Sequence, residues 1–508
     1  MPASLLPEAL LRPDGPIAAT DRELAAVFAG WPLGHPDARL VQEYLTGRAA
    51  GVLDVSGRPA AGSGAEAATM GTDGNGTDGA GTDRTDGVDT PAPGSIVLDD
   101  ASGALALVVA LTGAGPVVAY ADSIAAEESA RRAVDAVEAV GSRIQRMASV
   151  QPTPGLRALA EASRSLPGPC RVILSAPKAV RVLDEYLEVL APVAAEFVVV
   201  GRDKHMSRGL NAELAKFYDR VDVSPGRAKS RLLIASRPRS AASQGTASHV
   251  PVPGASDRIP APRTAAVSTQ VPGIPDIRVS AFGACFGGPT SDPGSELLLD
   301  AVRSHLGPAA PAADLPEADG SPPAAAEPAP MDADQQVVPR RILDLGCGNG
   351  WLLAALGALH PGAALAGVDV SRAAIASAAV TCAAGTPDGN GSRARAADPH
   401  HPQPTCPQLL LQDATAPLPW GTGAEAVAAG TFDLVVLNPP FHDGTTIETG
   451  TARTLIHRAH ELLAPGGRLV CVFNTHLRYR PIVDRVFGNS VQWARDRRFT
   501  VVSAAAPT

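Results

Sequence analysis

The chain has 508 residues, which is too long for one hydrophobic core and predicts two domains with connecting segments. It is 45% hydrophobic with a formal net charge of −9, and it lacks the run of about 18 apolar residues that a membrane span needs. The beginning of the chain has no basic segment followed by an apolar one, and the six cysteines never form a CxxC pair. These features argue against a membrane-spanning protein, a disulfide framework and a zinc site, and they favour the cytoplasm.

Four segments lack the apolar periodicity of a packed element, and we expect them to be disordered or loosely packed. They are residues 56–94, 240–275, 307–338 and 384–408. The first contains a degenerate Gly-Thr-Asp repeat that superficially resembles calcium-binding Gly/Asp repeats. It lacks the double glycine and the apolar position of those repeats, which favours a solvated acidic loop.

Outside these segments, short strands rich in Val, Ile and Leu alternate with amphipathic helices. In the first half, strands are expected at 95–100, 117–122, 171–176, 196–201 and 230–236, and helices at 123–148, 178–190 and 205–218. In the second half, strands are expected at 341–346, 365–370, 408–413, 432–438, 468–474 and 499–505, and helices at 350–359, 371–383, 451–463 and 479–487. Such alternation is typical of parallel sheets covered on both faces. The sequence therefore predicts two tandem doubly wound Rossmann-like α/β domains, at 1–240 and 276–508, joined by a linker at 241–275.

A glycine loop follows the strand that begins at Arg341. Its glycines are Gly346, Gly348 and Gly350, and glycine lets a ligand approach the main chain closely. A GxGxG loop alone also fits the pyrophosphate of a dinucleotide. Asp344, directly before the loop, would repel a pyrophosphate but suits the cationic amino-acid end of S-adenosylmethionine.

Two more acids end the next two strands. Asp369 is placed to accept hydrogen bonds from both ribose hydroxyls, and Asp413 to meet the adenine amino group. Ligands of open α/β sheets bind at the carboxyl ends of the strands. The three acids and the glycine loop together predict S-adenosylmethionine as the cofactor.

The motif Asn438-Pro439-Pro440-Phe441 follows the fourth strand of the second half. The prolines fix the turn, so that the Asn438 side-chain oxygen and the Pro439 carbonyl can accept both hydrogens of a planar NH₂ group. Holding both hydrogens favours the positive charge that develops as the nitrogen attacks a sulfonium methyl group. Phe441 can stack on the base that carries the amine. We therefore predict methyl transfer to a planar nitrogen, with these four residues as the catalytic group.

The succession DLGCGNG, VDVS, LLLQDA, NPPFHDG and LAPGGRLVCVFN resembles the bacterial ribosomal RNA guanine-N2 methyltransferases, which have two duplicated methyltransferase-like domains. The resemblance implies S-adenosylmethionine-dependent methyl transfer to the exocyclic N2 amine of a guanine in ribosomal RNA, with the small subunit slightly favoured. Residues 286–295 resemble the family's F…D-x-G-Ser/Thr segment, which implies a contribution to the cofactor pocket. Residues 202–208 resemble its Lys-His-x-Ser stretch. Ribosomal RNA or a ribosomal subunit is the implied partner, and no metal is implied.

The first domain departs from a working methyltransferase. Its loop is DDASGA at 99–104, with one glycine, and SAPK at 175–178 stands where the second domain has NPPF. We interpret it as a degenerate duplicate that supports the fold and grips RNA. Residues 200–240 carry ten Lys or Arg residues and four acids, and an RNA-binding surface and an ordinary solvated face both remain open. The candidate RNA contacts there are Lys204, Arg227 and Lys229.

Several assignments stay open. His442 fits either a substrate contact or a surface histidine, and Asn474 and Arg478 fit either RNA contact or a capped strand end. The NPPF motif also serves enzymes that methylate glutamine side chains of translation factors or the N6 amine of adenine. A non-enzymatic alternative is an RNA-binding scaffold with a vestigial fold, which the intact motifs of the second domain argue against.

Overall fold

The computed structural model describes residues 16–49, 92–113, 115–137, 144–146, 155–239, 260–307, 338–384, 406–422, 426–440 and 446–508. The chain divides into two compact units, Met1–Ala261 and Pro262–Thr508. No described helix combines the length and the apolar character that crossing a membrane requires.

The first unit alternates strands and helices after two N-terminal helices. Its elements are α1 (Pro16–Val27), α2 (Pro36–Ala49), β1 (Ser95–Leu98), α3 (Ala104–Thr112), β2 (Val117–Tyr120), α4 (Ile124–Asp135), β3 (Ile144–Arg146), α6 (Gly155–Arg164), β4 (Cys170–Ser175), α7 (Val180–Leu190), β5 (Ala194–Arg202), η2 (Asp203–His205), α8 (Arg208–Phe217), β6 (Tyr218–Val223) and β7 (Ser230–Pro238).

The second unit opens with an antiparallel strand pair and then repeats the alternation. Its elements are β8 (Arg263–Val267), β9 (Ile277–Ala281), α9 (Pro293–Leu306), β10 (Arg341–Leu345), α10 (Trp351–Leu359), β11 (Ala364–Asp369), α11 (Arg372–Ala384), β12 (Gln408–Leu411), β13 (Phe432–Leu437), α12 (Thr446–Leu462), β14 (Leu463–Asn474), η6 (Thr475–Leu477), α13 (Arg480–Phe487), β15 (Val491–Arg495) and β16 (Phe499–Ala505).

The two units have the same sheet topology. The strand orders are β3-β2-β1-β4-β5-β7-β6 and β12-β11-β10-β13-β14-β16-β15. In each sheet five strands run parallel. The sixth strand in the order, β7 or β16, pairs antiparallel with the fifth, and the outermost strand, β6 or β15, pairs antiparallel with the sixth. This order places a topological switch point beside the central strand, β1 or β10, where ligands of doubly wound sheets bind. The predicted fold class is confirmed.

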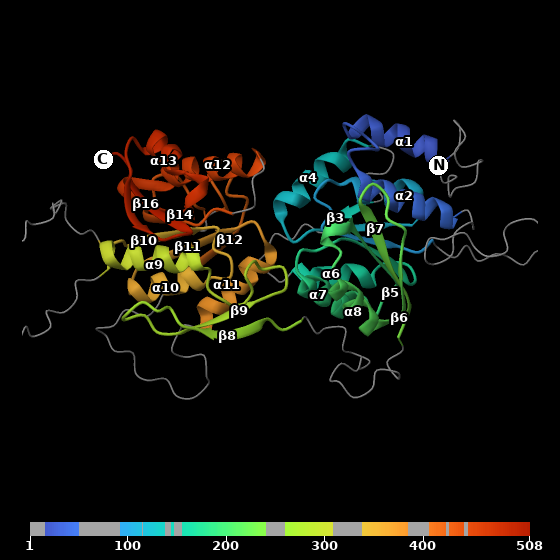
Figure 1. Cartoon of the computed structure of the whole chain (residues 1–508), viewed down its shortest axis with the longest axis horizontal. Coiled ribbons are helices and arrows are strands. Elements are labelled where there is room, and N and C mark those ends of the chain that lie inside the picture. Colours follow the sequence, from blue (N-terminus) through green and yellow to red (C-terminus); the bar gives the residue numbers. More distant parts are fainter. Residues whose placement is uncertain are drawn as a thin grey trace, which may run out of the picture. The chain divides into compact units, whose positions relative to one another are not determined.

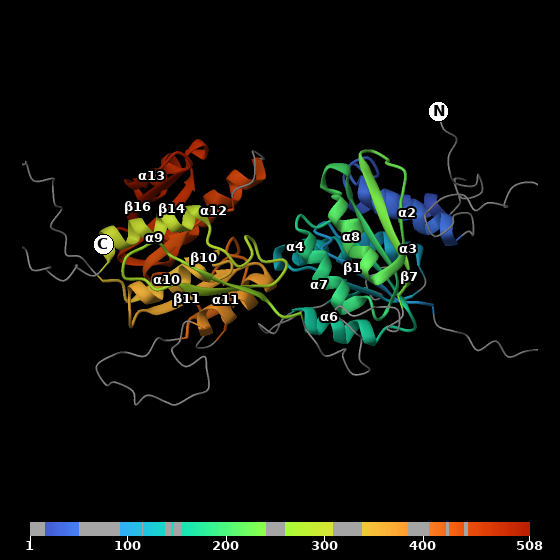
Figure 2. The same cartoon turned by 60° about the horizontal axis from the view of Figure 1, so that its bottom comes forward.

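Helices cover both faces of each sheet, because the central strands are apolar on both sides. In the second unit, Leu343 and Val435 pack against α12 and α13, whereas Ile342 and Leu434 pack against α9 and α10. Figure 1 shows α12 and α13 on the opposite side of that sheet from α9 and α10. In the first unit, α1 to α4 cover one face, and α6, α7 and α8, which Figure 2 labels together, cover the other.

The structure corrects three expectations for local structure. The helix expected at 123–148 is wrong beyond Asp135, because residues 144–146 form strand β3 at the sheet edge. Residues 260–275 are not a disordered linker, since β8 forms there and Val271 and Ile274 are buried in the core of the second unit. Helices α1, α2 and α6 were not expected, and all three contribute buried residues. The greater part of the four low-complexity segments lies outside the described residues.

One glycine in each unit is required by helix packing. Gly103 and Gly350 precede α3 and α10 with φ of 77° and 79°. A Cβ on Gly350 would lie 2.7 Å from Ala378 Cα in α11, and one on Gly103 would lie 2.8 Å from the Ala130 carbonyl oxygen in α4. At Gly346, by contrast, a Cβ would meet no atom within 4 Å. Gly103 and Gly350 therefore stabilise the fold, whereas Gly346 borders open space.

We expect Gly350→Ala to lower the free energy of unfolding of the second unit by about 2–4 kcal/mol, because left-handed strain and a backbone clash add together. Gly346→Ala is the matched control and should cost only about 1–2 kcal/mol, the strain alone. Urea unfolding followed by fluorescence of the buried Trp351 and Trp420 measures both variants. An equal destabilisation of the two variants would contradict the packing role.

Candidate active site

The candidate site residues of the second unit gather at one edge of its sheet. Strand β10 pairs in parallel with β11 and with β13, in registers that align Leu345 with Val368 and with Leu437. Strand β12 pairs with β11 at Asp369. Because these strands are parallel, their carboxyl ends lie together, and the structure brings Asp344, Asp369, Asp413 and Asn438 to the same edge.

Asp344 is a buried acid at the end of β10. Its residue is 2% exposed, and no hydrogen bond to its carboxylate is found among the described residues. Burial, and secondly the charge of Asp369, raises the pKa of Asp344 to about 7. Because a nearby cation would offset both effects, the site favours a positively charged ligand group.

Asp369 holds the glycine loop in place. Its Oδ2 accepts a hydrogen bond from the Gly348 backbone N at 2.9 Å, and its Oδ1 accepts one from the Ser371 N at 2.9 Å. A carboxylate oxygen can accept more than one hydrogen bond, so these two contacts do not by themselves exclude a ligand hydroxyl. This anchoring was not expected from the sequence, which indicated only ribose contact.

Asn438 presents an unsatisfied oxygen. Its side-chain Nδ2 donates hydrogen bonds to Asp292 Oδ2 at 2.9 Å and to Ser295 Oγ at 2.8 Å. Its Oδ1 is shielded from solvent and has no hydrogen-bond partner within the described part of the chain. An unmet buried acceptor costs about 1–3 kcal/mol, which an incoming N–H group would recover. The geometry therefore leaves this oxygen for a ligand donor.

The segment that carries Asp292 and Ser295 is itself fixed at both ends. Asp292 caps α9 by accepting the Ser295 backbone N–H at 3.1 Å. At the other end, Asn349 Nδ2 donates to the carbonyl oxygens of Gly288 and Thr290, both at 2.8 Å. The segment thus links the glycine loop to Asn438. Sequence reasoning missed the roles of Asn349 and Ser295, although the side-chain amide inside DLGCGNG was a visible signal.

The remaining candidates lie as follows. Asp413 Oδ1 accepts hydrogen bonds from the Thr415 N at 2.8 Å and Oγ1 at 2.7 Å. Pro439 is buried and Pro440 is exposed. Phe441 and His442 lie outside the described residues. The described residues hold no group of three or more His, Cys, Asp or Glu side chains placed to bind a metal ion.

The equivalent strand ends of the first unit lack this arrangement. Leu98 of β1 pairs with Tyr120 and Leu174 as Leu345 pairs with Val368 and Leu437. The buried Val97 therefore occupies the place of Asp344, and Ser175 that of Asn438. The first unit has no acid and no amide at these two positions.

In the first unit, the loop at 99–104 contains two acids whose carboxylates stabilise the fold. Asp99 accepts hydrogen bonds from the Asp122 N at 2.9 Å and the Tyr186 hydroxyl at 2.9 Å, and burial raises its pKa to about 6. Asp100 Oδ1 accepts from the Gly103 N at 3.0 Å, and Oδ2 from the Ala106 N at 3.0 Å, at the start of α3. Their carboxylates are thus occupied by the protein's own donors.

The three predicted RNA contacts of the first unit lie close together. Lys204, Arg227 and Lys229 are exposed, and the Lys229 carbonyl accepts a hydrogen bond from the Asp203 N at 2.8 Å. Arg227, however, forms an ion pair with Glu43. Other cations of the stretch also pair with acids, namely Lys216, Arg220, Arg231 and Arg239.

One family model matches part of each unit. A model described as "Methyltransferase small domain" matches residues 331–401 and 409–503, and a model described as "RLMG N-terminal domain" matches residues 84–239. Among curated proteins, the ribosomal RNA large subunit methyltransferase G of Streptomyces griseus is 37% identical over 164 residues, which are 32% of this chain and 36% of that protein. The ribosomal RNA small subunit methyltransferase C of Chromohalobacter salexigens is 35% identical over 165 residues, which are 32% of this chain and 40% of that protein.

A solved structure extends the likeness over most of the chain. The T. thermophilus 16S rRNA N2 methyltransferase RsmC, solved with AdoMet and guanosine, covers 81% of this chain and 88% of its own, with a TM-score of 0.53 and 20% identity. At that identity the match shows a shared fold, and the curated proteins are matched over less than half of their length. The predicted resemblance is confirmed: the chain is similar to the ribosomal RNA methyltransferases G and C, and it matches an RLMG N-terminal domain model followed by a methyltransferase small domain model.

Proposed function

We propose that the chain is an S-adenosylmethionine-dependent methyltransferase that modifies the exocyclic N2 amine of a guanine in ribosomal RNA. The observation that carries the proposal is the Asn438 Oδ1 atom, a buried acceptor without a partner among the described residues, at the edge that also holds Asp344 and the glycine loop. The curated relatives are named as ribosomal RNA methyltransferases of both subunits, and the solved neighbour holds AdoMet and guanosine. We further propose that the protein acts in the cytoplasm, and on RNA of the small ribosomal subunit in preference to the large one.

The residues present fit S-adenosylmethionine. Asp344 offers a buried carboxylate for the ammonium group, and the space beside Gly346 and Gly348 admits the amino-acid portion without a Cβ in the way. Asp369 and Asp413 are the candidates for the ribose hydroxyls and the adenine amine. When bound, the cofactor supplies an electrophilic methyl group on a sulfonium.

The proposed role of Asn438 is to orient the attacking nitrogen. A guanine N2 amine is a poor nucleophile, because its lone pair is delocalised into the ring. Acceptance of its two N–H groups by Asn438 Oδ1 and the Pro439 carbonyl stabilises the positive charge that develops on the nitrogen. Asp292 and Ser295 bind the amide NH₂, so the amide cannot rotate to present a donor instead. The target base has to be unpaired to reach this oxygen.

The first unit is proposed to support the fold and to grip RNA without cofactor. Val97 and Ser175 replace the acid and the amide of the second unit, and Asp99 and Asp100 are bound to their own chain. Lys204, Arg227 and Lys229 are its proposed RNA contacts.

The direct test is incubation of the full chain with methyl-labelled S-adenosylmethionine and ribosomal RNA, followed by mass spectrometry of the nucleosides. We expect N2-methylguanosine as the labelled product. N6-methyladenosine as the product would contradict the guanine assignment, and so would unlabelled RNA together with labelled glutamine in a parallel incubation with a translation factor. Absence of transfer to RNA, ribosomal subunits and proteins would favour the scaffold alternative.

We expect one S-adenosylmethionine per chain, with an affinity that rises with pH through Asp344. Burial holds the pKa of Asp344 at about 7 in the free protein, and the cationic ligand binds the ionised form. Binding at lower pH must therefore expel a proton, and affinity should fall about tenfold for each pH unit below the pKa. Isothermal titration calorimetry between about pH 5.5 and 7 measures the slope.

Asp344→Asn is the matched control, because it keeps the side-chain shape and removes the titrating group. It should bind weakly and with little pH dependence over the same range. A native affinity that does not change with pH would exclude Asp344 as the partner of the ammonium group. A stoichiometry of two would show that the first unit also binds cofactor.

Asn438→Ala should lower the methyl-transfer rate by about 10²–10³, the usual cost of one preorganised acceptor or donor, with cofactor affinity nearly unchanged. Ser295→Ala removes one of the two bonds that hold the amide and should give a smaller decrease, about tenfold. Ser295→Thr retains the hydroxyl group and should restore the rate. Single-turnover kinetics and calorimetry separate the two quantities. A native rate in Asn438→Ala, or abolished cofactor binding as the main effect, would be inconsistent with the orienting role.

A further inference from the structure

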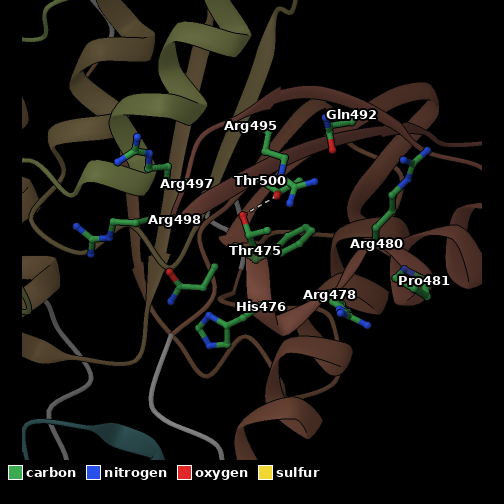
Figure 3. Close-up of a pocket in the computed structure, with 12 residues that line it drawn as sticks. Thr475, His476, Arg478, Arg480, Pro481, Gln492, Arg495, Arg497, Arg498 and Thr500 are labelled. Atoms are coloured by element: carbon green, nitrogen blue, oxygen red, sulfur yellow. Dashed lines mark hydrogen bonds between the residues drawn. The ribbon is translucent and has the colours of Figure 1, made fainter.

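A second basic surface lies in the second unit, at the end of its sheet. We name it the arginine pocket and define it by Arg478, Arg480, Arg495, Arg497, Arg498 and His476. Its volume is about 780 Å³, and the lining residues identified in the structure include no acid. Figure 3 shows the arginines spread around the hydrogen-bonded pair Thr475 and Thr500, whose Oγ1 atoms are 2.9 Å apart. The pocket thus concentrates positive charge in a chain whose net charge is −9.

Most of the arginines of this pocket can bind an external anion. Arg478, Arg495 and Arg497 are exposed and form no ion pair with any described acid. The neighbouring carboxylate of Asp496 accepts hydrogen bonds from the backbone N–H groups of Arg498 and Phe499 instead, at 2.6 and 2.5 Å. This differs from the basic stretch of the first unit, where several cations are paired with acids of their own unit.

The other two arginines are held by the fold with their charge retained. Arg480 donates to the Ser490 carbonyl at 2.9 Å and lies 3.9 Å from Asp484. The Arg498 guanidinium lies over the Phe499 ring, 5.0 Å from its centroid. Guanidinium groups bind phosphate in a planar, bidentate geometry, so the pocket is suited to phosphodiester groups.

The arginine pocket adjoins Asn438 through a chain of contacts. Asn438 Nδ2 is 2.9 Å from Asp292 Oδ2. A Cβ on Gly294 would lie 2.9 Å from that oxygen and 3.3 Å from Phe499 Cδ1, so the first turn of α9 packs directly on the Phe499 ring. Arg498 covers the same ring. In addition, β14 ends at Asn474 beside the carboxyl end of β13, and Asn474 pairs with Phe499.

We infer that the arginine pocket binds the phosphate backbone of the RNA strand that flanks the target guanine. The inference rests on the proposed function, because it is the strand next to the base at Asn438 that reaches the pocket. A base presented to that oxygen carries its 5′ and 3′ phosphates with it, and cations at the same sheet edge are placed to neutralise them. The catalytic unit therefore has its own RNA anchor, in addition to the contacts proposed for the first unit.

The test is a triple variant, Arg478→Gln, Arg495→Gln and Arg497→Gln, in the full chain. RNA affinity falls as salt rises, and each phosphate contact that is lost makes the plot of log affinity against log salt less steep by ~0.7. Loss of three contacts should therefore reduce the steepness by about 2. At about 0.1 M salt the dissociation constant of a ribosomal RNA fragment should rise between tenfold and a hundredfold. The KM for RNA should rise with little change in kcat, and cofactor affinity by calorimetry should stay the same.

The charge-matched control replaces three exposed arginines outside the pocket, Arg263, Arg278 and Arg340, by glutamine. Replacement of the three pocket arginines by lysine should restore most of the affinity, since phosphate binding depends on charge. An unchanged salt slope in the pocket variant, or an equal change in the control, would overturn the inference. A variant that binds assembled ribosomal subunits more weakly but binds naked RNA normally would also overturn it, because the pocket would then contact a ribosomal protein.

The experiments distinguish a failure of this inference from a failure of the proposed function. If the native chain methylates guanine N2 while the pocket variant binds RNA normally, the function stands and the anchor is wrong. If the native chain binds RNA but transfers no methyl group, the function fails, and the salt slope still reports on the pocket.

Discussion

The site depends on the restraint of one amide. Asp292 and Ser295 together bind both hydrogens of the Asn438 amide, so its oxygen alone remains for a ligand. A freely rotating amide could present either a donor or an acceptor, and only an acceptor suits an incoming NH₂ group. The segment that contains Asp292 and Ser295 is in turn bound to the glycine loop, through the hydrogen bonds of Asn349. Cofactor loop and acceptor are therefore parts of one hydrogen-bonded structure, and the acceptor oxygen is preorganised before any ligand arrives.

A comparison of the two similar units distinguishes the residues that stabilise the fold from those that suit a ligand. Both sheets have the same strand order, and both keep the glycine that lets two helices approach closely, Gly103 and Gly350. The glycines that border open space in the second unit have no counterpart in the first. There Asp99 and Asp100 fill the loop and bind to Tyr186 and to the start of α3. The first unit therefore keeps the packing of the fold without the open glycines and the acid that suit a ligand.

Much of the fold and part of the site could be predicted from the sequence. Apolar strands alternating with helices indicate a doubly wound sheet, and parallel strands necessarily bring Asp344, Asp369 and Asn438 to one edge. The bonds between Asn438 and the segment at 292–295 could not be predicted, because the partners are 146 and 143 residues apart. Of the arginine pocket, only Arg478 was named from the sequence. Arg495, Arg497 and Arg498 follow α13 in the chain, and the pairing of β14 with β16 brings them beside the residues that precede it. Helix 123–148 was overextended because an edge strand of three residues, β3, leaves almost no pattern.

The central claim is that Asn438 presents an acceptor to the amine of the target base. A crystal structure of the full chain with S-adenosylhomocysteine and guanosine measures this directly. The account predicts the guanine N2 atom within about 3 Å of Asn438 Oδ1, at hydrogen-bond distance, with the Asn438 Nδ2 still bound to Asp292 and Ser295. A base whose N2 amine points away from Asn438, or an amide turned so that Nδ2 faces the base, would contradict it.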